Sequence, residues 1–126
     1  MSINLLVTFV TGASDPAGTR YSGVIKNLNA NPNVSLNTIT VSGPHTLTRA
    51  SVPAAPSPGN LAIAITSDEG GKASLGTETD ITQTTVFNPN TAKQIPLKGG
   101  TYSFEAVSTA PGPSSSTTIN MLVTIS

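Results

Sequence analysis

Few residues in this sequence are suited to chemistry. His45 is the one histidine, and there is no cysteine. A Ser–His–Asp triad would need this imidazole as its base, and a closed zinc site would need four ligands, mostly Cys or His. Because His45 follows Pro44 at a turn and begins a polar stretch, we expect a solvent-facing or locally hydrogen-bonded ring. The sequence therefore predicts no catalytic residue, no zinc site and no cofactor.

One acidic cluster is a candidate for calcium. Asp68, Glu69, Glu78 and Asp80 would offer several carboxylate oxygens if their two segments paired as a hairpin. Their spacing fits no calcium loop, however, and Lys72 lies among them. A solvated, charged turn that discourages edge-to-edge pairing is the favoured interpretation, and calcium binding is left open.

A glycine loop follows the first apolar stretch. Residues 10–14 read Val-Thr-Gly-Ala-Ser, which resembles the phosphate loop of short-chain dehydrogenases. That loop needs further glycines at set spacing and a helix N-terminus to hold the pyrophosphate. Pro16 stands where the next glycine should be, and Tyr21 and Lys26 are one residue too far apart for that family's Tyr-x-x-x-Lys pair. We interpret the stretch as an ordinary loop.

Composition narrows the classes of function. Only 10% of the 126 residues are charged, and six basic residues balance six acidic ones. A nucleic-acid binder needs a basic face, so we expect no nucleic-acid partner. The apolar stretch at residues 3–10 is too short and too interrupted for a signal peptide or a membrane span. The sequence predicts a single domain, residues 1–126, without a membrane partner. We expect it to be made in the cytoplasm, or exported by a route that the sequence does not show.

The elements that must position these residues are strands. Residues 2–9 and 118–125 are nearly the same stretch, each alternating apolar and mostly polar positions as a strand with one buried face does. No long window shows a helical period. The sequence predicts an all-β fold, a β-sandwich of about eight strands. We expect it to be immunoglobulin-like or jelly-roll-like, with the N- and C-terminal strands adjacent or central.

Three further strands carry specific expectations. Residues 19–28 read as one strand with a bulge at Gly23. Residues 34–42 read as a strand whose bulge near residues 37 and 38 puts Val34 and Leu36 on the same side as Ile39 and Val41. Residues 45–52 read as a polar edge strand.

Candidate interface residues come from two places. Leu6 and Leu122 stand at the same register on the polar faces of the two end strands. If those strands are neighbours, the leucines form an apolar spot that another subunit or another part of the chain would cover. The Pro-rich arm at residues 53–59 is a candidate for that internal cover and for contact with a partner. Residues 109–117 read as a flexible loop. The prolines of the arm that we expect at an interface are Pro53, Pro56 and Pro58.

The whole chain resembles, in style, the capsid decoration (cement) proteins of bacteriophages. The resemblance rests on the short strand at residues 3–10, the Pro-rich arm and the turn-strand Gly99–Phe104. It implies a non-enzymatic structural protein of the virion, made in the host cytoplasm. Such a protein acts as a homo-oligomer on a repeated protein lattice such as a major capsid protein.

Other classes of function stay open. A carbohydrate-binding module or lectin is the alternative, although there is no Trp to stack on a sugar. A small hydrolase is a third class, and it would require His45 in a pocket touching a Ser or Asp. A cytoplasmic location is the alternative to the virion.

Overall fold

The computed structural model describes residues 2–49, 61–68, 72–74, 93–108, 111–112 and 114–126. These residues form strands joined by turns, and none of them is helical, so the predicted all-β fold is confirmed. The ten strands are β1 (Ile3–Thr11), β2 (Arg20–Ser22), β3 (Val24–Asn27), β4 (Ile39–Val41), β5 (His45–Arg49), β6 (Leu61–Ser67), β7 (Lys72–Ser74), β8 (Lys93–Leu97), β9 (Gly100–Ser108) and β10 (Thr117–Ile125).

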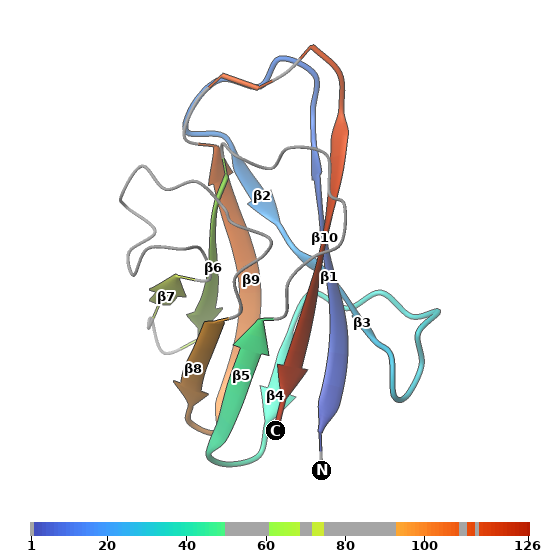
Figure 1. Ribbon diagram of the computed structural model, residues 1–126, viewed down its shortest axis with the longest axis vertical. Helices are drawn as coiled ribbons and strands as arrows, with labels where there is room; N and C mark the ends of the chain where they lie inside the picture. Colours follow the sequence, from blue (N-terminus) through green and yellow to red (C-terminus); the bar gives the residue numbers. More distant parts are fainter. Residues whose placement is uncertain (1, 50–60, 69–71, 75–92, 109–110, 113) are drawn as a thin grey trace.

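The strands form two antiparallel sheets (Figure 1). Sheet A has the order β3-β1-β10-β5-β8. Sheet B has the order β2-β9-β6-β7, and β4 pairs with the lower half of β9 beyond the end of β2. Long strands lie at the middle of each sheet and short strands at the ends.

The two end strands lie side by side, as predicted. β1 and β10 pair antiparallel along their whole length, from Ile3 opposite Ile125 to Thr11 opposite Thr117. β3 flanks this pair on one side and β5 on the other, so both end strands are also interior strands. The antiparallel register places Leu6 directly opposite Leu122.

The chain passes from sheet B to sheet A at Gly23. β2 pairs with β9 in sheet B, and β3 pairs with β1 in sheet A. Between them the Gly23 amide donates to the Phe104 carbonyl at 2.8 Å. The single strand predicted for residues 19–28 is therefore divided at its predicted irregular point, and each half belongs to a different sheet.

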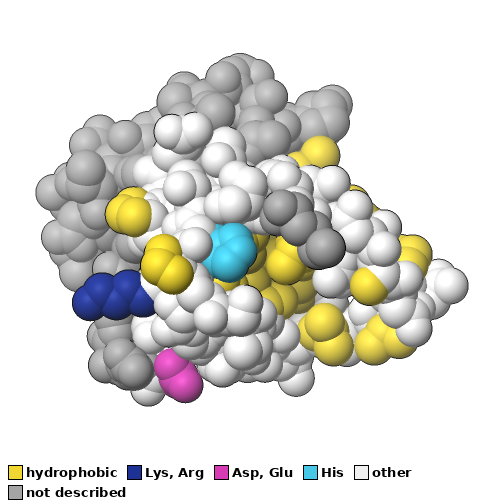
Figure 2. Space-filling model, turned by 90° about the horizontal axis from the view of Figure 1, so that it is seen from below, with side chains coloured by type: hydrophobic (Ala, Val, Ile, Leu, Met, Phe, Trp, Pro, Cys, Tyr) yellow, Lys and Arg dark blue, Asp and Glu magenta, His cyan; other side chains and the backbone are white. Residues whose placement is uncertain are grey.

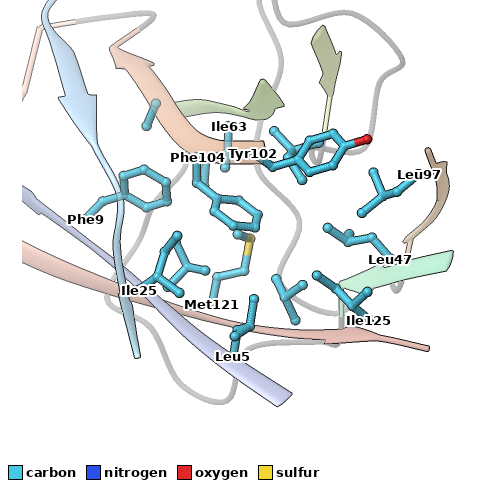
Figure 3. Packing of buried hydrophobic residues seen from close by; sticks show 14 of the residues in the cluster. Leu5, Phe9, Ile25, Leu47, Ile63, Leu97, Tyr102, Phe104, Met121 and Ile125 are labelled. Atoms are coloured by element: carbon cyan, nitrogen blue, oxygen red, sulfur yellow. The ribbon is translucent and has the colours of Figure 1, made fainter. Parts of the chain in front are cut away.

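One hydrophobic core joins the sheets. Side chains of β1 and β10, such as Phe9 and Met121, meet side chains of β6 and β9, such as Ile63 and Phe104 (Figure 3). All four are at most 2% exposed. Burying these alternating positions is the main stabilising contribution, worth about 1.5–3 kcal/mol for each large apolar side chain.

Two of the predicted strands are corrected. β5 is an interior strand, with β10 and β8 as its neighbours, rather than the predicted edge. Its polar sequence hides this, because Leu47 is the one side chain among residues 45–48 that is buried in the core. Val34 and Leu36 are 44% and 38% exposed, so they do not share the buried side of Val41.

Other predictions fall outside the described residues, namely the Pro-rich arm and most of the stretch between β7 and β8. Of the predicted loop at residues 109–117, the Gly112 amide donates to the Asp15 carbonyl at 2.8 Å, and Thr117 already belongs to β10. In the described part of the chain, no helix is long and apolar enough to cross a membrane.

Candidate interaction surface

Leu6 and Leu122 meet on the outer face of sheet A. They are direct cross-strand partners, which places their Cβ atoms about 5 Å apart. Leu122 is 37% exposed and Leu6 is half-buried, whereas their neighbours in each strand point into the core. The predicted apolar spot therefore exists, and both leucines contribute to it.

Hydrogen-bonded polar pairs flank the two leucines. On one side the Thr124 hydroxyl donates to Oδ1 of Asn4 at 3.0 Å, and on the other the Thr8 hydroxyl donates to Oδ1 of Asn120 at 2.8 Å. Each pair is also a cross-strand pair. We call the resulting surface the leucine platform, and its residues are Asn4, Leu6, Thr8, Asn120, Leu122 and Thr124.

A second exposed feature follows β3. Residues 28–38 are all exposed, and Figure 1 shows this part of the chain projecting from the side of sheet A. Leu28 and Val34 are 43% and 44% exposed. We call residues 28–36 the anchored loop, because both of its ends are held by hydrogen bonds to sheet A.

The anchors of this loop are backbone hydrogen bonds. At its start, the Leu28 amide donates to the Asn4 carbonyl at 2.9 Å. At its end, Leu36 and Ile25 exchange two bonds of 2.8 Å each, which add residue 36 to the outer edge of β3. Fixed ends restrict the loop and lower the entropy that its ordering would cost on binding.

Apolar exposure in the described residues is one-sided. The six exposed large apolar side chains all lie on the outer face of sheet A or on the anchored loop; they are Val10, Val24, Leu28, Val34, Leu36 and Leu122. By contrast, the described outer face of sheet B carries paired hydroxyls. Thr66 and Ser103 approach to 2.8 Å, and Thr40 and Thr101 to 3.3 Å.

Two shallow hollows adjoin these features. One lies beside the platform, between the start of the anchored loop and Leu122. The other, of about 180 Å³, opens at the lower end of the core between Ile3, Ile125 and β4. Figure 2 shows hydrophobic side chains in a hollow at this end, beside His45, the one histidine, with few charged side chains around them.

His45 bonds locally, as the sequence predicts. Its Nδ1 atom lies 2.8 Å from the Gly43 carbonyl, two residues earlier in the chain, and the ring is half-buried. This bond fixes the ring at the turn into β5. A triad would require a Ser or Asp side chain at this nitrogen, where the backbone carbonyl is found instead.

A polar cluster around Asp15 holds the loop that follows β1. Oδ2 of Asp15 accepts from the Gly12 amide at 2.8 Å and from the Tyr21 hydroxyl at 2.5 Å. Partial burial of the phenol, reinforced by the hydrogen bond and the negative charge of Asp15, raises the pKa of Tyr21 to about 12. Tyr21 is therefore a neutral donor at physiological pH, and the cluster holds the glycine loop that resembles a phosphate loop.

The acidic cluster is described only at Asp68, which is exposed and whose amide donates to the Thr101 carbonyl at 3.0 Å. Glu69, Glu78 and Asp80 lie outside the described residues. Among the residues that are described, no three His, Asp or Glu side chains gather as a metal site would need. The solvated, charged turn stays the prediction for the complete cluster, with calcium binding as its alternative.

The sequence located the leucines, and the Asn-rich stretch at residues 29–33 predicts the turn that the structure shows; the apolar residues on both sides of this turn were placed wrongly. Pro53, Pro56 and Pro58 lie outside the described residues. Leu28, Val34 and Leu36 were assigned to strands, although the Asn-rich stretch between them is typical of a turn. The chain turns back on β3 before it reaches β4, so Leu28 and Val34 lie in the connection and Leu36 lies on the outer edge of β3.

Comparison with protein-family models and with curated proteins finds no match to this chain.

Proposed function

We propose that this chain is a non-enzymatic structural protein that works by surface contact, as a decoration protein on a virion capsid. The anchored loop is the observation that carries the proposal. Three apolar side chains, those of Leu28, Val34 and Leu36, are exposed on a loop tied at both ends to a rigid sheet. Exposed apolar groups gathered on one face are typical of protein-binding surfaces.

The partner that suits this surface is a repeated protein lattice such as a major capsid protein. The loop offers uncharged side chains, and the chain as a whole has no net charge, so binding would rest on apolar contact more than on electrostatic steering. One loop contributes a small contact, and many copies on a lattice multiply it. Pro53, Pro56 and Pro58 of the predicted arm would extend the same contact.

The fold is proposed to be a β-sandwich of the immunoglobulin-like or jelly-roll kind. The shared core of the two sheets and the passage of the chain between them at Gly23 support this interpretation. Such a scaffold presents loops at its ends and sides without needing a catalytic pocket.

Co-sedimentation with capsid shells tests the proposal. The shells are assembled from the major capsid protein encoded nearest to this chain, and electron microscopy then asks whether the bound protein repeats with the lattice. The double variant Leu28→Ser and Val34→Ser should bind about tenfold or more weakly, because the apolar anchors of an interface carry most of its energy.

The matched control is Val10→Ser, which removes an apolar side chain of the same class that is 58% exposed and lies away from the loop. It should bind as the unaltered protein does. A wild-type protein that stays monomeric and binds no shell would overturn the proposal.

The alternative, a carbohydrate-binding module or lectin, needs an exposed aromatic ring. Phe9, Tyr102 and Phe104 are buried, and Tyr21 is half-buried with its hydroxyl bonded to Asp15. Phe87 lies outside the described residues. The described rings therefore give this alternative no support, and a glycan array would test it directly.

A further inference from the structure

We propose that the leucine platform is the interface of a homodimer, in which two copies pack the outer faces of β1 and β10 against each other. This inference concerns a different surface from the anchored loop and does not depend on the virion proposal. It rests on the arrangement of the six platform residues, on their lack of charge and on the size of the face.

The platform has a local twofold symmetry. Asn4, Leu6 and Thr8 follow one another on the outer face of β1, and the same three residue types follow in the same order on β10. The strands are antiparallel, with Leu6 opposite Leu122. A half-turn about the sheet normal between the leucines therefore exchanges the two strands, and the four polar corners alternate between Asn and Thr.

This alternation makes the platform complementary to itself. When a second copy faces the first across a twofold axis that runs along the strands, Leu6 lies opposite Leu122 of the other copy. Each Asn lies opposite a Thr by the same operation. An Asn amide N–H then faces a Thr hydroxyl oxygen, so a donor meets an acceptor at every corner.

The polar corners are already partly satisfied within each copy. Thr124 and Thr8 donate their hydroxyl hydrogens to Asn4 and Asn120 of the same chain. Burying these groups in a dimer therefore removes fewer hydrogen bonds to water than burying isolated side chains would. The remaining amide hydrogens and hydroxyl lone pairs are the groups that the second copy meets.

Charge selects the direction of the axis. None of the platform residues is ionisable, and Lys26 lies opposite Leu6 on β3. A twofold axis across the strands would place Lys26 directly over Lys26 of the other copy. An axis along the strands offsets them sideways by three strand spacings, about 14 Å, which exceeds the Debye length of about 8 Å at physiological salt.

The face is large enough for a modest interface. Strands β1 and β10 have nine residues each, β3 has four, and β5 and β8 have five each. At about 3.4 Å per residue and about 4.8 Å per strand, the face of the sheet spans roughly 500 Å². Stable interfaces bury roughly 800 Å² on each partner. We therefore expect a reversible dimer whose population depends on concentration.

Analytical ultracentrifugation over a concentration series tests the dimer. Leu122→Ser should raise the dimer dissociation constant about tenfold or more, while its thermal unfolding stays close to that of the unaltered chain. Val34→Ser is the matched control, because Val34 is 44% exposed but lies on the anchored loop. It should leave the dimer unchanged.

A charge-pair experiment tests the orientation and does not rely on the leucines. With the axis along the strands, Asn4 lies beside Asn4 of the other copy, at a sideways distance of one strand spacing, about 5 Å. The distance from Asn4 to Asn120 of the other copy is about 14 Å. Asn4→Asp and Asn4→Lys should each weaken their own homodimer, and a mixture of the two should restore it. A mixture of Asn4→Asp with Asn120→Lys removes the like-charge repulsion but forms no close charge pair, so it should restore the dimer less.

The possible results of these experiments distinguish the dimer proposal from the capsid proposal. A wild-type chain that remains monomeric at its highest soluble concentration overturns the proposal, and the capsid experiment can still succeed with such a monomer. A large loss of stability in Leu122→Ser, together with a monomeric wild-type chain, would assign the cover of the leucines to the chain itself. Restoration by Asn4→Asp with Asn120→Lys alone would overturn the proposed axis.

Discussion

Asp15 connects three segments of the upper loops. Its side chain accepts from the Gly12 amide and from the Tyr21 hydroxyl, and its own carbonyl accepts from the Gly112 amide. Nearby, the Ser116 hydroxyl donates to the Thr11 carbonyl. Asp15 directly follows the stretch that resembles a phosphate loop, and it joins the loop after β1 to the segment before β10.

The raised pKa of Tyr21 predicts how the stability of the protein changes at alkaline pH. The pKa of Tyr21 is raised from 10.0 to about 12 in the folded chain. Below pH 10 the phenol is protonated in both states, and between pH 10 and about 12 the unfolded chain loses the proton while the folded chain keeps it. The free energy of unfolding should therefore fall across this window.

Replacing Tyr21 by Phe should remove the contribution of Tyr21 to this fall in the free energy of unfolding. Chemical denaturation at a series of pH values measures it, and the other alkaline groups cancel in the difference between the two proteins. At neutral pH the variant should be less stable by about 1–3 kcal/mol, because Asp15 loses a donor. Parallel curves for the two proteins between pH 10 and about 12 would contradict the assignment.

Substitutions of two adjacent residues on β1 should have very different effects on the free energy of unfolding. Phe9 is 0% exposed and Val10 is 58% exposed. Phe9→Ala should lower the free energy of unfolding by about 3–5 kcal/mol, because it leaves a cavity in the shared core. Val10→Ala should change it by less than about 0.5 kcal/mol. Urea denaturation of both variants measures the contrast, and equal losses would mean that the register of β1 is wrong.

At the scale of the elements, Gly23 lets one strand serve two sheets. A Cβ atom at this position would lie 2.9 Å from Cβ of Phe104 and 2.9 Å from Cγ1 of Val7. Those two residues belong to opposite sheets, so the glycine sits where the backbone passes closest to both. The sequence predicts an irregularity here but does not say that the chain changes sheets.

Gly23→Ala should lower the free energy of unfolding by about 1–3 kcal/mol, because the added methyl overpacks the core between Val7 and Phe104. Gly43, at the turn between β4 and β5, has nothing within 4 Å of a built Cβ, so Gly43→Ala should be nearly neutral. Thermal and chemical unfolding of the pair provide the measurement. An unchanged free energy of unfolding for Gly23→Ala would show that the structure can accommodate a methyl group at position 23.

The segments that were placed wrongly from the sequence were misplaced for the same reason. Alternation identifies β1, β9 and β10 because each is long and buries every second side chain. β5 buries few side chains, yet its backbone pairs on both edges, and backbone pairing leaves no trace in side-chain polarity. Val34 and Leu36 are apolar but lie in the anchored loop, so hydrophobicity alone assigned them to a strand.

At the scale of the whole molecule, the pairing of β1 with β10 brings the described ends of the chain together. Ile3 and Ile125 are cross-strand partners, with Cα atoms about 5 Å apart. A circular permutant that joins residue 126 to residue 1 through a short Gly/Ser linker and opens the chain within the anchored loop should therefore fold. Closely spaced ends tolerate such rearrangement.

We expect the permutant to keep the circular dichroism spectrum of a β protein and a single cooperative thermal transition a few degrees below that of the parent. It should also lose binding to capsid shells if the anchored loop is the contact, because opening the loop frees its ends. An unfolded permutant with a generous linker would argue against the end-to-end register of β1 and β10.

The sequence alone determined the all-β class, the two matched end strands, the irregularity at Gly23 and the outward leucines. These features follow from the local alternation of apolar and polar residues and from the backbone freedom of glycine. Both can be read within a single strand. The folded chain was needed to show which strands are neighbours, that Leu6 lies opposite Leu122, and that Asn and Thr alternate around them. Those facts depend on strand direction and register across more than a hundred residues, which no local pattern encodes.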